Sequence, residues 1–219
     1  MDKIAITFRD FTAHLIPGLM YFAGFFYLFP EKLALIEGRE FFVSVLALFG
    51  AYATGFIADT VFFPKFNKLI RKIPLFKDPV VTYFDAFKDM PETAEATTVK
   101  HLAYRAMVAH LGQKVVSGTK NTILIYSCIR YVETQNIEVG NILARINSLG
   151  NLSICMAPPL LLVSAISFWK LNVLIGAAAL ILVYFTLRKN LSYRDWLART
   201  AIRHYLMIRL ENGFSPKAS

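Results

Sequence analysis

Long stretches of apolar residues constrain this chain more than any other feature of its sequence. They cover residues 11–29, 41–63, 149–168 and 173–187, and each contains at most one acidic side chain. A helix needs about 20 predominantly apolar residues to cross the hydrocarbon core of a bilayer. Only four residues separate the third stretch from the fourth, which predicts a tight antiparallel hairpin. We therefore predict an all-α integral membrane protein with four transmembrane helices in two hairpins and a cytoplasmic helical segment between them.

The overall composition agrees with this prediction. The chain is 56% hydrophobic, whereas a soluble domain has about 45–50% apolar residues. Its formal net charge is +9, which in a soluble protein would suggest nucleic-acid binding. In a membrane protein the same excess indicates topology and contact with anionic lipid, so we expect no direct contact with nucleic acid.

The distribution of positive charge predicts the orientation. Residues 1–14, 64–148 and 188–219 fall on one side of the membrane and hold 21 of the 24 lysines and arginines. Because lysine and arginine are retained on the cytoplasmic side, we predict a multi-pass protein of the bacterial inner (plasma) membrane with both termini in the cytoplasm. The first apolar stretch ends without a cleavage signal, so we expect it to be retained as a helix.

The chain is predicted to have four parts. Residues 1–63 form the N-terminal segment and first hairpin, 64–148 a cytoplasmic helical region, 149–187 the second hairpin and 188–219 a basic amphipathic tail. Four prolines between residues 64 and 91 make long helices improbable there. The tail has two interpretations, either an interfacial helix on anionic lipid or a continuation of the fourth helix into a cytoplasmic bundle.

Small residues recur every four positions in the second apolar stretch, at Ala47, Ala51 and Gly55. Such a stripe lets another helix approach closely. Asp59 follows at the same interval, and an acid that faces lipid is costly, so this side of the helix should face protein or water. The stripe predicts a tight contact within one chain, a subunit interface of a homo-oligomer or a wet cavity.

Two adjacent prolines, Pro158 and Pro159, lie within the third apolar stretch. Each removes a backbone donor, and the freed carbonyls must find partners in the protein or in a cavity. Together with Asp59, the pair is our candidate for the lining of a pore or cavity. A static kink is the alternative.

Basic side chains gather directly after the second and fourth apolar stretches. At these positions they can contact anionic headgroups or a partner protein. The candidate lipid-binding or partner-binding residues are Lys65, Lys68, Arg71, Lys72, Arg194, Arg199 and Arg203.

An arginine followed five positions later by a histidine occurs three times, and Arg105/His110 is the best placed of these pairs. The spacing is similar to the R-x4-6-H motif of HEPN-type ribonucleases, in which a paired arginine and histidine cleave RNA. No P-loop, GxGxxG, HExxH, GxSxG or zinc-type cluster occurs in the sequence. The main expectation is therefore a protein without catalytic residues, cofactor or metal.

Several features together resemble small bacterial membrane proteins of anti-phage defence loci. They are the two short hairpins, the Pro17-Gly18 entry to the first helix, the Ala-Tyr-Ala-Thr-Gly stretch at 51–55, the basic middle segment and the arginine-rich tail. The resemblance is to the membrane subunit of Kiwa-type systems and to membrane accessory proteins of type VI CRISPR loci. It implies an oligomeric membrane effector or sensor, in some cases with a cytosolic partner encoded nearby.

Three functional hypotheses follow. The first is a non-enzymatic homo-oligomer that opens a pore or perturbs the bilayer after its cytoplasmic helices receive a signal. The second is a membrane scaffold that recruits a cytosolic effector protein and conducts nothing. The third is a membrane-tethered HEPN-like ribonuclease.

Overall fold

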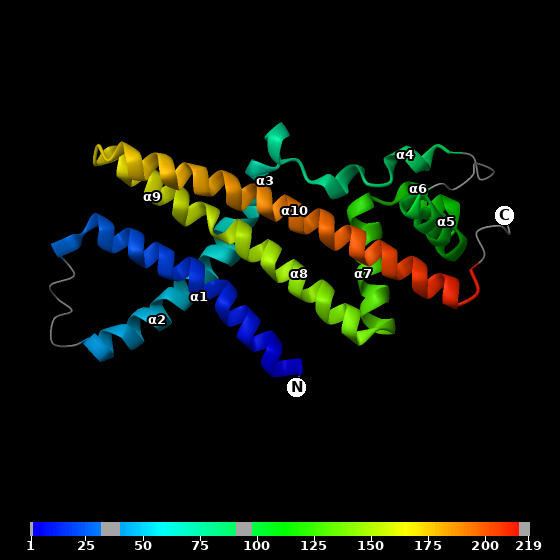
Figure 1. Ribbon diagram of the computed structural model, residues 1–219, viewed down its shortest axis with the longest axis horizontal. Coiled ribbons are helices and arrows are strands. Elements are labelled where there is room, and N and C mark those ends of the chain that lie inside the picture. Colours follow the sequence, from blue (N-terminus) through cyan, green and yellow to red (C-terminus); the bar gives the residue numbers. More distant parts are fainter. Residues whose placement is uncertain (1, 32–39, 91–97, 215–219) are drawn as a thin grey trace. The chain divides into compact units, whose positions relative to one another are not determined.

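The computed structural model describes residues 2–31, 40–90 and 98–214. Throughout these residues the regular structure is helical and contains no strand (Figure 1), which confirms the all-α prediction. The chain divides into two compact units. The first unit comprises Met1–Lys77 and Ser148–Asn190, and the second comprises Asp78–Asn147 and Leu191–Ser219.

The first unit contains the predicted hairpins. Helix α1 covers Asp2–Leu28 and α2 covers Glu40–Ile57. A π-helical turn, Ala58–Phe62, follows α2 directly and leads into α3, Phe63–Ile70. The second apolar stretch is therefore helical throughout, and its helix continues into the first basic cluster, which includes Lys65 and Lys68.

Helices α1 and α2 pack through their glycines. A Cβ built on Gly18 would overlap the carbonyl oxygen of Ala51, and one built on Gly55 would overlap the carbonyl oxygen of His14. Only glycine permits this approach of two backbones. Ala51 is fully buried. Ala51 and Gly55 of the small-residue stripe thus form a contact within the chain, which is one of the three predicted alternatives.

The third apolar stretch consists of two helices rather than one. Helix α8 covers Ile137–Cys155, and α9 covers Ala157–Trp169. Pro158 and Pro159 lie in the first turn of α9, with Met156 as its N-cap. The first backbone N–H groups of a helix have no partner within it, so prolines are tolerated there. Met156 is the single turn residue between the two helices, so the helical segment Ile137–Trp169 is interrupted directly before the proline pair, where the missing backbone donors lie.

The second hairpin turns where the sequence predicts. Helix α9 ends at Trp169 and α10 begins at Val173. The Ser164 hydroxyl donates to the Gly176 carbonyl at 2.9 Å and joins the two helices. Helix α10 then continues to Glu211 without a break, so the tail is a continuation of the fourth apolar helix.

A hydrogen-bonded network joins three elements of the first unit. Arg71 Nη2 donates to Asn190 Oδ1 at 2.6 Å, and Arg71 Nε donates to Asn67 Oδ1 at 3.0 Å. Asn190 Nδ2 donates to the Gly150 carbonyl at 2.7 Å. Asn190 is buried. This Arg71–Asn190 network connects the end of α3 with α8 and α10.

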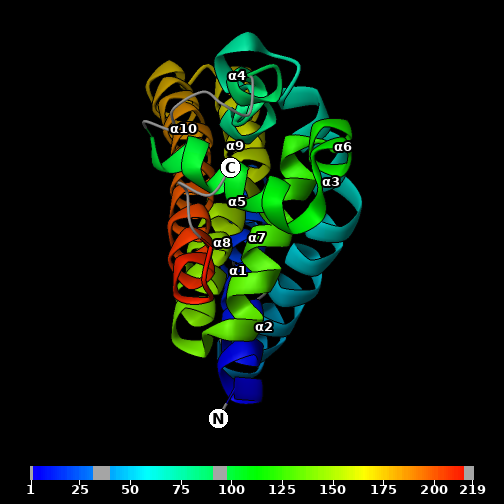
Figure 2. The same cartoon turned by 90° about the vertical axis from the view of Figure 1, so that its right-hand side faces the viewer.

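The second unit is a helical cluster with its own core. Helices α5 (Val99–Leu111), α6 (Gln113–Gly118) and α7 (Asn121–Gln135) lie with the first part of α8 and the last part of α10 (Figure 2). Short helices at Pro79–Thr82 and Asp85–Lys88 (α4) precede them. Pro74 and Pro79 thus begin short helices, as predicted, whereas Pro64 lies in α3, which continues the long helical run that starts at Glu40, and Pro91 lies outside the described residues.

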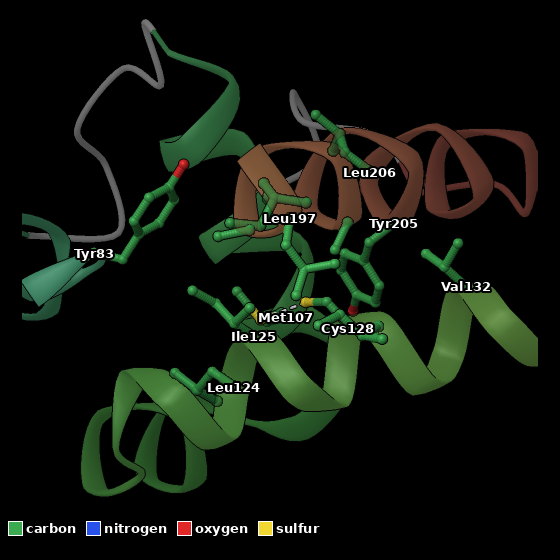
Figure 3. Packing of buried hydrophobic residues seen from close by; sticks show 14 of the residues in the cluster. Tyr83, Met107, Leu124, Ile125, Cys128, Val132, Leu197, Tyr205 and Leu206 are labelled. Carbon is green, nitrogen blue, oxygen red and sulfur yellow. Dashed lines mark hydrogen bonds between the residues drawn. The ribbon is translucent and has the colours of Figure 1, made fainter. Parts of the chain in front are cut away.

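The core of the second unit is built on amphipathic spacing. Buried residues of α10 recur every three or four positions and meet α5 and α7 (Figure 3). Cys128 Sγ lies 3.5 Å from Met107 Sδ within this core. Burial raises the pKa of Cys128 to about 12, so its sulfur stays a protonated thiol at neutral pH. The core face of α10 consists of Leu197, Ala198, Ala201, Ile202, Tyr205 and Leu206.

Two helical segments are long and apolar enough to cross a membrane, Ile137–Trp169 and Val173–Glu211. Only 39% and 28% of their most apolar windows are buried in the protein, so most of this apolar surface lies open. Val43–Ile57 is a shorter apolar helix. Large apolar side chains stand exposed across the first unit, including Phe41, Phe49, Leu174 and Phe185.

Candidate anion-binding site

A hollow of about 520 Å³ in the second unit collects basic and aromatic side chains from distant parts of the sequence. We call it the basic–aromatic pocket. Helix α10 supplies most of the lining, α5 supplies its first turn, and the segment between Pro79–Thr82 and α4 supplies one tyrosine. The lining residues are Tyr83, Val99, Lys100, Trp196, Arg199, Thr200, Ile202, Arg203 and His204.

Local sequence signals position the two helices that line the pocket, α5 and α10. Thr98 caps α5, because its hydroxyl accepts a hydrogen bond from the His101 N–H at 3.2 Å. Lys100 therefore lies in the first turn of α5. On α10, Trp196, Arg199 and Arg203 are three and four positions apart and share one face. The face that carries the core residues is a different one, so the helix is apolar inward and basic outward.

Arg194 has a structural contact instead of a place in the pocket. Its guanidinium pairs with Asp78 at 2.5 Å, and Asp78 also accepts a hydrogen bond from the Val80 N–H at 3.1 Å. This carboxylate is only 11% exposed, so the pair is shielded more than a typical surface ion pair. The contact fixes the start of the Pro79–Thr82 turn, which leads to Tyr83.

Tyr83 forms the buried floor of the pocket. It is 7% exposed, and the Arg199 guanidinium lies beside its hydroxyl oxygen, to which it can only donate. The hydroxyl proton itself has no acceptor among the residues that the structure describes. Burial, with a smaller contribution from Asp195, raises the pKa of Tyr83 to about 12, and Arg199 opposes this rise. The phenol is therefore neutral at physiological pH and keeps a proton that it can donate.

The electrostatic balance of the pocket is positive. Lys100 Nζ lies 3.8 Å from the centroid of the Tyr83 ring, a cation–π contact. Arg199 pairs with Asp195 at 2.5 Å, but the arginine side chain is 66% exposed, so this pair is weak. Among the described residues, no carboxylate lies within ion-pair distance of Lys100 or Arg203. An anion that enters the pocket therefore meets more positive than negative charge.

Two of the predicted residues of the first unit, Pro158 and Lys65, line a different hollow, which is apolar. A groove of about 630 Å³ is lined by Pro158 and Lys65 with side chains of α1, α2 and α9. Pro159 is fully buried, and Lys68 and Lys72 are exposed. The side chain of Asp59 lies outside the described part of the structure. The full lining of the groove is Tyr21, Thr54, Ile57, Ala58, Lys65, Phe66, Leu69, Pro158 and Leu162.

Arg105 and His110 both lie on α5. Five positions along an α-helix correspond to a rotation of about 140°, so their side chains leave the helix on different sides. His110 is exposed and meets the Tyr131 ring edge to face at 6.1 Å. Within one chain this geometry does not bring the arginine and the histidine to a common point.

Two residues of the pocket, Arg199 and Arg203, were predicted from the basic tail as contacts for lipid or a partner protein, not as part of a pocket. Their helical spacing with Trp196 is the sequence signal for this side of it. Tyr83 and Lys100 come from segments more than 90 residues earlier, and no local pattern marks them. Among the described side chains, no group of three or more His, Cys, Asp or Glu residues could hold a metal ion.

No protein-family model matches this sequence, and comparison with curated proteins and with solved structures finds no similar protein. The arrangement of the residues themselves therefore carries the functional argument.

Proposed function

We propose that this chain is a multi-pass inner-membrane receptor whose second unit binds an anionic ligand from the cytoplasm. In this proposal four helices cross the membrane: α1, α2, α9 and the first part of α10. The exposed apolar side chains of the first unit support this, because water would contact them in a soluble protein. The lysines and arginines of residues 64–148 and 188–219 would then lie on the cytoplasmic side.

The basic–aromatic pocket is the observation that carries the receptor proposal. It combines guanidinium and ammonium groups with a buried phenolic donor, and anions are bound by such charge-assisted hydrogen bonds. A second feature suggests how binding reaches the membrane. Helix α10 supplies six of the nine pocket residues and also contains the last apolar stretch. A ligand that moves or orders this helix therefore acts on an element that we place partly in the bilayer.

The membrane response that we propose is the opening of a pore or a perturbation of the bilayer by a homo-oligomer. This fits the resemblance to anti-phage membrane effectors, and it needs no catalytic residue. The alternative is a scaffold that recruits a cytosolic effector protein through the basic face of α10 and conducts nothing. The ribonuclease hypothesis has less support, because Arg105 and His110 diverge within one chain.

Pyrophosphate is a suitable first probe of the pocket, because it offers dense negative charge without other chemistry. We expect it to bind the full-length protein in lipid nanodiscs, measured by isothermal titration calorimetry. The double variant Arg199→Gln/Arg203→Gln should weaken binding at least tenfold, since a hydrogen bond to a charged group contributes about 1.5–3 kcal/mol.

The matched control is Lys114→Gln/Arg130→Gln, which removes the same charge from exposed positions of the second unit outside the pocket. This control should bind pyrophosphate as the wild type does. Equal weakening in both double variants would show that only net charge matters, and the receptor proposal would be refuted.

A further inference from the structure

We propose that the anionic ligand of the basic–aromatic pocket is a nucleotide, with its phosphates on the basic residues and its base on Trp196. This inference rests on the proposed function, because it names the ligand class of the same pocket. Its volume of about 520 Å³ falls within the range of about 300–1,000 Å³ that is usual for small-molecule sites.

The phosphate end of the site is defined by four donors. Arg199 and Arg203 are one helical turn apart on α10, and guanidinium groups bind phosphate oxygens in a bidentate manner. Lys100 faces them from α5 and adds a point charge. The Tyr83 hydroxyl lies beside Arg199, and its proton has no acceptor among the described residues. Its oxygen has almost no accessible surface, so a phosphate oxygen accepts from it only after a side chain that covers it moves aside.

The aromatic end of the site is Trp196. Its side chain lines the pocket and is 50% exposed, so part of its surface is open to a ligand. Tyr193 lies beside it, with ring centroids 6.3 Å apart. A nucleobase of any type has a flat face that stacks on an aromatic ring. Inorganic phosphate or a carboxylate would leave this surface unused.

The spacing along α10 orders the two ends. Trp196 and Arg203 are seven residues apart, which corresponds to about 10 Å along the helix axis. Arg199 lies between them. Arg199 is about 4.5 Å, Thr200 about 6 Å and Arg203 about 10 Å from Trp196 along the axis. A base on Trp196 therefore leaves Arg199 and Thr200 within reach of the ribose and the first phosphate, and Arg203 within reach of the terminal phosphate of a nucleoside diphosphate.

The reporter for this proposal is the tryptophan itself. The chain has two tryptophans, Trp169 and Trp196. A Trp169→Phe variant leaves Trp196 as the sole indole, so its fluorescence reports only on the pocket. We expect adenosine, guanosine, cytidine and uridine diphosphates to quench this fluorescence in nanodiscs made of a neutral lipid. Pyrophosphate should bind more weakly and quench less.

Removal of the ring isolates the contribution of the base. Trp196→Ala should weaken binding of the diphosphates about 5- to 150-fold, the range for loss of one stacking contact, and leave pyrophosphate binding unchanged. Trp196→Phe, which keeps an aromatic face, should recover most of the loss. Trp169→Ala should leave both affinities unchanged, because Trp169 ends α9 in the first unit, outside the pocket. Calorimetry provides the affinities where the indole is absent.

The outcomes separate the two proposals. If pyrophosphate binds as tightly as the diphosphates, or if Trp196→Ala weakens both equally, the nucleotide inference is wrong while the anion receptor stands. If neither binds, both are wrong. If vesicles that contain phosphatidylglycerol, or an acidic peptide, bind the pocket and no nucleotide competes, the ligand is a lipid headgroup or a protein partner, and the nucleotide inference is again refuted.

Discussion

Replacement of Asn190 by leucine should destabilise the protein because it removes the centre of the Arg71–Asn190 network. Asn190 accepts a hydrogen bond from the Arg71 guanidinium at 2.6 Å and donates one to the Gly150 carbonyl at 2.7 Å. A hydrogen bond to a charged group contributes about 1.5–3 kcal/mol and a neutral one about 0.5–1.5 kcal/mol. Arg71 keeps its bond to Asn67 Oδ1, so its charge is not left alone. The expected loss is therefore about 2–4.5 kcal/mol.

The assay is thermal unfolding of the full-length protein in detergent, followed by circular dichroism at the helix band. For a chain of this size, 1 kcal/mol shifts the unfolding midpoint by about 2–4 °C, so Asn190→Leu should lower it by about 4–18 °C. The matched control is Asn151→Leu, which changes an exposed residue of α8 beside Gly150 and should shift the midpoint by less than about 2 °C.

A double-mutant cycle tests whether the loss comes from the network itself. Arg71→Met alone should destabilise the protein, and the double variant Arg71→Met/Asn190→Leu should lose less than the sum of the single losses, because both remove the same bond. If Asn190→Leu behaves like Asn151→Leu, or if the two single losses simply add, the network does not hold α3, α8 and α10 together and the reasoning fails.

Two further predictions concern the packing of each unit. Gly55→Ala should lower the unfolding midpoint, because the added Cβ would overlap the His14 carbonyl oxygen. The control Gly24→Ala should be neutral or stabilising, because its Cβ would lie 3.5 Å from Val163 Cγ2, an ordinary contact distance. Equal midpoints for the two variants would contradict the close approach of α1 and α2. In the second unit, His101 is buried and its ring stacks on Phe87, with ring centroids 5.0 Å apart. Burial, and to a smaller extent the nearby Arg105 charge, lowers the pKa of His101 in the folded protein below 6.5. As the pH falls, the imidazole of the unfolded chain is protonated before that of the folded protein, so the free energy of unfolding should decrease below about pH 6.5. His101→Phe should reduce the fall in midpoint between pH 7 and pH 5, and a wild-type pH dependence in that variant would exclude the histidine as its source.

The sequence alone was enough to establish that the chain is helical and where several helices end. Apolar stretches of this length leave few alternatives, because backbone groups in an apolar environment must be paired within a helix. The turn between α9 and α10 and the short helices of residues 74–88 follow from equally local signals, a four-residue polar connection and a series of prolines. The amphipathic tail was likewise visible, but its two interpretations were not separable.

Tertiary structure decided what those local signals left open. The tail continues α10 because its apolar face finds partners on α5 and α7, and the hydrophobic spacing of 197–206 would look the same on a lipid surface. Pro158 and Pro159 announce an interruption in the sequence, and the structure places it at Met156, between α8 and α9. Ala51 and Gly55 pack against α1, where a small-residue stripe by itself names no partner.

The candidate site shows the same division between local and non-local information. Arg199, Arg203 and Trp196 share a face of α10 because helical periodicity requires it, so the sequence already contained that half of the pocket. Tyr83 and Lys100 reach it only because the core of the second unit folds the chain back on itself. Burial there leaves the Tyr83 hydroxyl proton without an acceptor among the described residues, beside a cluster of cations, and burial is a property of the assembled core rather than of any segment.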